Sequence, residues 1–171
     1  MSYFSMNLKK SFQSALEILQ LNESAMTQVA MDGEATRPAA LFVVLGALAA
    51  GLGVTFFPVH MGMVVYRPDL FWIVKMTFFE SVGMLLGLYF GGFVAEKVFH
   101  SRLNRDGFVR VMGHASLLGV LAVFPPLSIL CVWNLVVWWR VCTRIGKMQP
   151  EATVLFLIIL VVFAAGLSSL G

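Results

Sequence analysis

Residues 108–143 read FVRVMGHASLLGVLAVFPPLSILCVWNLVVWWRVCT, and this apolar stretch decides the fold. It is interrupted at Phe124-Pro125-Pro126-Leu127, where paired prolines cannot continue a helix. The stretch therefore predicts two helices, 108–124 and 127–143, that form a hairpin. Each half has about 17 residues, which is close to the shortest length that crosses a hydrocarbon layer of ~30 Å.

Three further apolar runs, at 39–57, 71–95 and 152–170, are long enough to cross a bilayer. Hydrophobic residues make up 59% of the chain and charged residues only 12%, a composition that excludes an ordinary soluble domain. The predicted fold class is an all-α, polytopic transmembrane helical bundle with five spans. A four-span bundle in which the 108–143 hairpin is re-entrant is the alternative.

The basic residues predict the orientation of the chain in the membrane. Of the twelve Lys and Arg residues, all but Arg67 and Lys75 fall at one end of the predicted bundle. Short loops rich in Lys and Arg stay on the cytoplasmic side, so we expect the N-terminus in the cytoplasm and the C-terminus outside. The same distribution accounts for the net charge of +3, and we expect no nucleic-acid partner.

The first 36 residues are more polar than the rest, and we expect a cytoplasmic segment over 1–36 ahead of a membrane domain over 37–171. This segment lacks the pattern of a cleavable signal peptide. It predicts an amphipathic helix that lies on the inner leaflet or on a partner. A second short helix, which Asn22 caps and which ends near Asp32-Gly33, would pack either on the protein's own loops or on a partner. The apolar positions are Phe4, Leu8, Phe12, Leu16 and Leu19 in the first helix and Ala25, Met26 and Val29 in the second.

The second run contains a row of small residues beside a carboxyl group. Gly83, Gly87 and Gly91 recur every four residues and predict a smooth helix-packing groove that another helix can approach closely. Glu80 lies on the same helical face near mid-membrane, where an ionised carboxyl group is costly and commonly functional or paired. We expect Glu80 either to be protonated or hydrogen-bonded and to fix helix register, or to carry a proton pathway.

Two other polar residues fall inside predicted spans, His114 in the third and Asn134 in the fourth. Together with Glu80 they would form a proton relay if all three faced one cavity. His114 could also ligate haem or chlorophyll, but a lone intramembrane histidine is more often a hydrogen-bonded packing residue. We therefore predict no cofactor, and the cysteines show no metal-binding or disulfide pattern.

Several short motifs follow one another over most of the chain. They are Gln28-Val29-Ala30-Met31-Asp32, Ala39-Ala40, Phe108-Val109-Arg110-Val111-Met112-Gly113-His114-Ala115, Pro125-Pro126, Trp133-Asn134-Leu135 and Gly146-Lys147. In this order they resemble the Ypt/Rab-interacting protein (Yip) family in its prokaryotic form. The resemblance implies a non-enzymatic integral membrane protein, and we expect it in the bacterial cytoplasmic membrane.

The chain departs from the Yip pattern at identifiable positions. Family members commonly have Gly-Tyr where this chain has Gly113-His114, and a proline close to Leu118. The Asp-Leu motif of eukaryotic members is matched only by Asp69-Leu70, on the opposite side of the membrane from the N-terminus. We therefore infer no Rab binding.

The sequence contains no constellation that indicates a reaction, and we expect no enzymatic activity. It predicts a membrane scaffold or accessory protein that associates with other membrane proteins through helix packing, as a subunit of a larger hetero-oligomeric complex. The expected partners are the lipid bilayer and those membrane proteins. The alternative function is a small proton-coupled transporter or channel that uses Glu80.

Overall fold

The computed structural model describes residues 8–57, 59–61, 64–66 and 69–168 of the 171. Nearly all of them are helical. The α-helices are α1 (Leu8–Leu19), α2 (Glu23–Met31), α3 (Thr36–Phe56), α4 (Leu70–Lys97), α5 (Arg105–Ala115), α6 (Trp133–Arg140) and α7 (Pro150–Ser168). The 3-10 helices are η1 (Gly33–Ala35), η2 (Ser116–Val123) and η3 (Pro125–Val132), the π-helix is η4 (Val141–Ile145), and the strands are β1 (Val59–Met61) and β2 (Val64–Tyr66).

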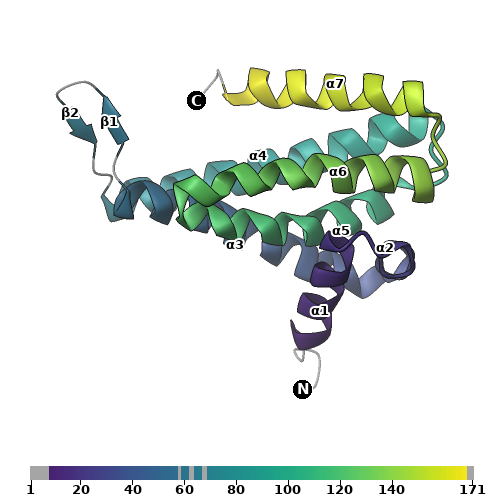
Figure 1. Ribbon diagram of the computed structural model, residues 1–171, viewed down its shortest axis with the longest axis horizontal. Helices are drawn as coiled ribbons and strands as arrows, with labels where there is room; N and C mark the ends of the chain where they lie inside the picture. The colour runs from purple at the N-terminus through teal and green to yellow at the C-terminus, as the bar shows by residue number, and fades with distance from the viewer. Residues whose placement is uncertain (1–7, 58, 62–63, 67–68, 169–171) are drawn as a thin grey trace.

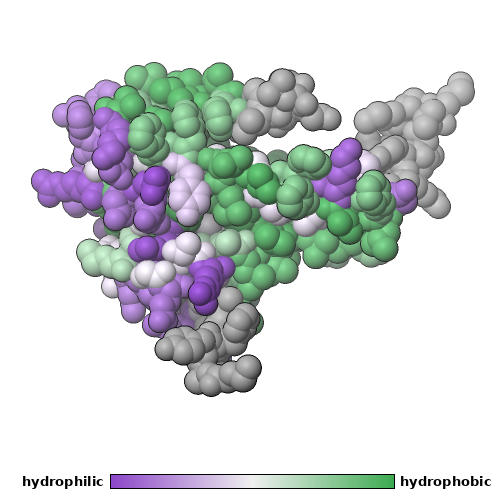
Figure 2. All heavy atoms as spheres, turned by 180° about the vertical axis from the view of Figure 1, so that it is seen from behind, coloured by the Kyte–Doolittle hydropathy of each residue, from purple (hydrophilic) through white to green (hydrophobic). Residues whose placement is uncertain are grey.

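Helices α3, α4, α6 and α7 run along the long axis of the molecule, whereas α1 runs across it (Figure 1). Helices α1 and α2 and the connections after α4 and η4 lie at one end, which we call the polar end. The antiparallel β1–β2 hairpin, which the sequence did not predict, lies at the other end. Hydrophilic residues gather at the polar end, and most of the remaining surface in view is apolar (Figure 2). This separation of surfaces is the arrangement expected of a membrane protein.

Within the described residues, three helical segments are long and apolar enough to cross a membrane. They are Gly33–Phe56, Leu70–Lys97 and Arg105–Val123, which match the predicted runs at 39–57, 71–95 and 108–124 to within a few residues. Large apolar side chains stay exposed on these segments, such as Phe78 at 61% and Phe79 at 60% on α4. Contact with lipid chains carries no hydrophobic cost for such side chains, whereas their exposure to water is unfavourable.

The predicted hairpin at the paired prolines is confirmed. Phe124 has an extended backbone (φ −108°, ψ 98°) between η2 and η3, and the Leu127 amide donates a hydrogen bond to the Phe124 carbonyl (2.8 Å). The ring of Phe124 lies 5.8 Å from that of Phe57, so the hairpin tip reaches the end of α3. The proline pair therefore ends one helix and starts the next, as expected from the missing amide protons.

The hairpin differs from expectation in the type of helix that flanks its tip. Each of η2 and η3 is an eight-residue 3-10 helix, not an α-helix. A 3-10 helix rises about 2.0 Å per residue, so η2 extends about 16 Å and α5 with η2 together reach roughly 30 Å. Because of this larger rise per residue, a run of the shortest membrane-crossing length can match the full hydrocarbon thickness.

The N-terminal helices pack on the polar end. The Asn22 side chain accepts hydrogen bonds from the amides of Ser24 (3.0 Å) and Ala25 (3.3 Å), which confirms that Asn22 caps α2. The predicted apolar positions of α2 are buried. In α1, Ala15 and Ile18 are buried, whereas Leu8, Phe12 and Leu16 form an exposed apolar stripe; the predicted position Phe4 lies outside the described residues.

Helix α5 is the centre of the polar end, because α1, α2, α3, α4 and α6 all contact it. The Arg110 guanidinium donates hydrogen bonds to the Thr36 hydroxyl (3.0 Å) and the Ala30 carbonyl (2.9 Å), so it joins α5 to the connection between α2 and α3. The ring of Phe108 contacts those of Trp138 and Phe156 edge-on, at 5.7 and 5.9 Å between centroids. These contacts hold α6 and α7 against α5.

Candidate helix-association surface

Helix α4 positions the carboxyl group and the glycines that the sequence singled out. The Asp69 carboxylate accepts a hydrogen bond from the Trp72 amide (2.7 Å) and caps the helix at its start. Glu80 then lies about 15 Å along the helix from Leu70 and about 25 Å from Lys97, near the middle of a membrane-length segment. Its side chain is exposed, and within the described part of the chain it forms no hydrogen bond or ion pair.

The three glycines of α4 have different surroundings. A Cβ atom at Gly91 would lie 3.1 Å from the Leu160 side chain and 3.4 Å from that of Phe108, so α7 and α5 pack closely there. A Cβ atom at Gly83 or Gly87 would meet no described atom within 4 Å. Among the described residues, the chain therefore fills the Gly91 part of the predicted groove, whereas no described atom covers the half-buried Gly83 and Gly87.

The closest helix packing in the described structure is between α3 and the α5–η2 segment, which the sequence analysis missed. A Cβ atom at Gly113 would lie 2.6 Å from the Ala39 Cβ, and one at Gly46 would lie 3.2 Å from the Ser116 carbonyl oxygen. Gly53 likewise faces the backbone of Ala122. The available signal was the spacing of Ala39, Gly46 and Gly53, since small residues seven positions apart lie on one face of a helix.

His114 is a buried packing residue, 1% exposed. Its Nδ1 lies 2.8 Å from the Arg110 carbonyl oxygen, and its ring makes an edge-to-face contact with Phe42, 5.3 Å between centroids. The ring contact joins α5 to α3, whereas the contact with Arg110 lies within α5. Neither involves Glu80 or Asn134.

Asn134 and Thr77 each contain a buried oxygen without a hydrogen-bond partner in the described structure, the Asn134 Oδ1 and the Thr77 Oγ1. Asn134 is the second residue of α6, whereas Thr77 and Glu80 lie on α4. The described contacts do not bring Glu80, His114 and Asn134 into one cluster, so they do not form the relay that the sequence left open.

The described residues contain no group of three or more His, Cys, Asp or Glu residues that could hold a metal ion. Cys131 and Cys142 are both free thiols. Comparison of the chain with protein-family models, with curated proteins and with solved structures finds no match in any of the three. The surfaces of this chain therefore provide the evidence about its function.

Proposed function

We propose that this protein is a non-enzymatic membrane scaffold or accessory subunit whose α4 binds a helix of another membrane protein. The observation that carries the proposal is a patch at mid-helix, containing Glu80, Gly83 and Gly87, that no described residue covers. Lipid can cover the apolar side chains around this patch, but an ionised carboxyl group in hydrocarbon costs about 3 kcal/mol or more. A partner helix would remove that cost by donating a hydrogen bond.

The glycines set the geometry of the proposed contact. Because no described atom lies within 4 Å of a Cβ at Gly83 or Gly87, a partner backbone can approach α4 closely and gain van der Waals contact. A hydrogen-bond donor at the level of Glu80 would fix the register of the two helices. The partner is therefore a membrane helix with small residues facing α4 and a hydroxyl, amide or basic side chain at mid-height.

In this proposal the polar end faces the cytoplasm and the N-terminus is cytoplasmic. The η3–α6–η4 segment and α7 are the fourth and fifth spans, which places the C-terminus outside, in a bacterial cytoplasmic membrane. The positive-inside rule supports this orientation, because the connections after α4 and η4, which carry basic residues such as Arg102 and Lys147, lie at the polar end. The resemblance to the Yip family remains a prediction and favours the same class of function.

The test is gentle-detergent purification of the native protein, with mass spectrometry of the proteins that elute with it. Gly87→Leu should remove a stoichiometric partner, whereas the matched control Val82→Leu, on the opposite face of α4, should keep it. A Cβ atom at Gly87 meets no described atom within 4 Å, so the helix content of Gly87→Leu should match that of the wild type. Retention of the partner by Gly87→Leu, or elution of the wild type alone, would refute the proposal.

Glu80 variants separate association from proton transport. Glu80→Gln keeps a hydrogen-bonding side chain of nearly equal size and should keep the partner, whereas Glu80→Leu should weaken the complex. If Glu80 instead carries protons, proton transport should be lost in both variants while the complex stays intact.

A further inference from the structure

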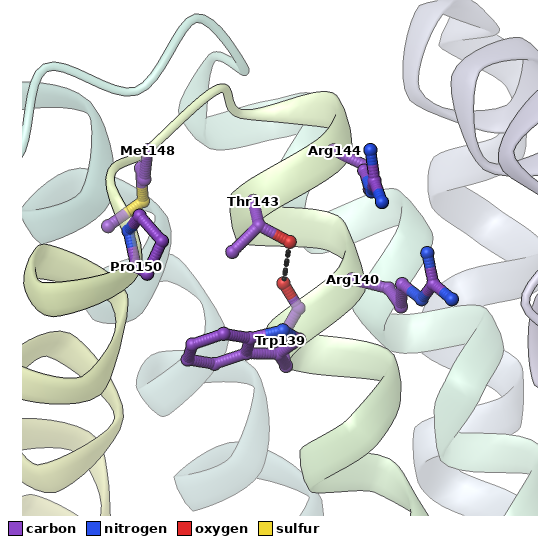
Figure 3. Close-up of a pocket in the computed structure, with 6 residues that line it drawn as sticks. All are labelled: Trp139, Arg140, Thr143, Arg144, Met148 and Pro150. Carbon is purple, nitrogen blue, oxygen red and sulfur yellow. Dashed lines mark hydrogen bonds between the residues drawn. The ribbon is translucent and has the colours of Figure 1, made fainter.

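A pocket of about 520 Å³ opens at the polar end between η4 and the start of α7. Figure 3 shows the two arginine side chains on the side that faces the N-terminal helices, with Met148 and Pro150 on the side of α7. The Trp139 ring lies farther from the C-terminal end of the α6–η4 segment and forms the bottom of the pocket. The lining residues are Trp139, Arg140, Thr143, Arg144, Met148 and Pro150.

The pocket has an excess of positive charge. Arg140 and Arg144 share a single carboxylate, that of Glu23 on α2, at 3.5 and 3.6 Å from the nearest guanidinium nitrogens. Both arginine side chains are well exposed, at 39% and 59%, so they can turn toward a ligand. One carboxylate cannot neutralise two guanidinium groups.

A second pocket at the polar end, of about 410 Å³, has balanced charges. The Glu96 Oε1 lies 2.7 Å from the Lys97 Nζ, and the Asp106 Oδ1 lies 3.1 Å from the Arg105 Nε. Its acids and bases pair with one another within the lining. The contrast identifies the Arg140 pocket as the one suited to an anion.

The backbone around the Arg140 pocket favours the same ligand. Helix α7 begins at Pro150, so the positive end of its dipole lies at the pocket wall. The π-helical turn η4 widens the helix at this point, a feature that occurs frequently at functional sites. The Thr143 hydroxyl donates its hydrogen bond to the Trp139 carbonyl (2.7 Å), which leaves the arginines as the donors to an anion.

The surface that leads away from the pocket toward the middle of the bundle is apolar. On α6, Leu135 and Val136 are 45% and 37% exposed, and on α7, Val154 and Leu155 are 48% and 53% exposed. Along α6 and η4, Trp139 follows Leu135 and Val136 and precedes the two arginines, a position typical of tryptophan at the membrane interface. A ligand with a charged head and long apolar chains fits this sequence of surfaces.

We propose that the Arg140 pocket binds the phosphate headgroup of an anionic phospholipid, with Arg140 and Arg144 on the phosphate and the acyl chains along α6 and α7. Basic pockets between membrane helices commonly hold such headgroups. This inference is independent of the α4 surface.

The test is native mass spectrometry of the purified full-length protein in detergent micelles with increasing amounts of phosphatidylglycerol. The wild type should retain one phosphatidylglycerol and prefer it to phosphatidylcholine. Arg140→Gln/Arg144→Gln should weaken phosphatidylglycerol binding about 30-fold. The control Lys97→Gln/Arg102→Gln, which removes the same charge at the same end but outside the pocket, should stay within about twofold.

A single further variant distinguishes lipid binding from a structural role of the arginines. If Arg140 and Arg144 only hold α2 through Glu23, then Glu23→Gln should weaken lipid retention as the double arginine variant does. In the proposed site, Glu23 competes with the phosphate, so Glu23→Gln should strengthen phosphatidylglycerol binding about fivefold. Weaker binding by Glu23→Gln would overturn the proposal.

Inorganic phosphate provides the last comparison. Because the acyl chains contribute to the proposed binding, millimolar phosphate should not displace the lipid. Displacement by inorganic phosphate, or equal retention of phosphatidylcholine, would overturn the assignment to an anionic phospholipid.

Discussion

Replacing Gly113 with Ala should destabilise the helical bundle, whereas the same replacement at Gly87 should not. At Gly113 the added Cβ would lie 2.6 Å from the Ala39 Cβ and 3.1 Å from both the Cα and the carbonyl oxygen of Ala39. At Gly87 it would meet no described atom within 4 Å. The two variants make the same chemical change in two different environments.

The magnitude follows from these distances. Carbon atoms pack best at about 3.5–4.0 Å, so α3 and α5 would have to separate by roughly 1 Å near Gly113. Overpacking of this kind costs about 1–3 kcal/mol, and Ala in place of Gly within a helix returns about 0.5–1 kcal/mol. The helix-propensity gain is common to both variants, so their difference in unfolding free energy should be about 1–3 kcal/mol.

The assay is reversible unfolding of the purified protein in mixed micelles by titration with sodium dodecyl sulfate, followed by circular dichroism of helix content. A double-mutant cycle with Ala39→Gly isolates the contact, because Gly113→Ala should cost much less when Ala39 has lost its Cβ. If Gly113→Ala is as stable as Gly87→Ala, the close approach of α3 to α5 is refuted.

Variants at three further residues test separate contacts by the same unfolding assay. Arg110→Gln removes the guanidinium hydrogen bonds to the Ala30 carbonyl and the Thr36 hydroxyl and should cost about 1.5–3 kcal/mol, with faster proteolysis between α2 and α3; unchanged proteolysis would contradict this. Asn22→Ala removes the cap of α2 and should cost about 1 kcal/mol, whereas Asn22→Asp should keep most of the stability. Asn134→Leu replaces a buried oxygen that has no described partner and should leave stability equal or higher; a clear loss would mean that Asn134 has a partner.

The boundaries of the apolar helices could be predicted because they depend on local properties. The run predicted at 71–95 is α4 (Leu70–Lys97), and the run at 39–57 is α3 (Thr36–Phe56). The turn at the proline pair and the cap formed by Asn22 could be predicted for the same reason, since each acts on the backbone within a few residues of itself.

The role of each glycine could not be predicted in the same way. Glycines on one helix indicate that a close approach is sterically allowed, but not which helix makes it. The glycines of α4 recur every four residues, yet no described atom lies near a Cβ at Gly83 or Gly87, whereas Ala39, Gly46 and Gly53, which recur every seven residues, face α5 and η2. That choice depends on how the helices are arranged, and single-helix patterns do not contain it.

The Arg140 pocket could not be predicted from the sequence either. In the sequence, Arg140 and Arg144 indicated only the orientation of the chain in the membrane. Their meeting with Glu23 of α2 and Pro150 of α7 requires segments far apart in the chain to pack around η4.

The sequence by itself determined that this chain is an apolar helical protein with membrane-length segments, a proline-turned hairpin and basic residues at one end. It could do so because hydropathy, proline chemistry and charge act locally along the chain. Only the packed structure shows that no described residue covers Gly83 and Gly87, that His114 packs on Phe42, and that two arginines share one carboxylate. Those outcomes depend on which helices touch and at what distance, which is a property of the packed molecule.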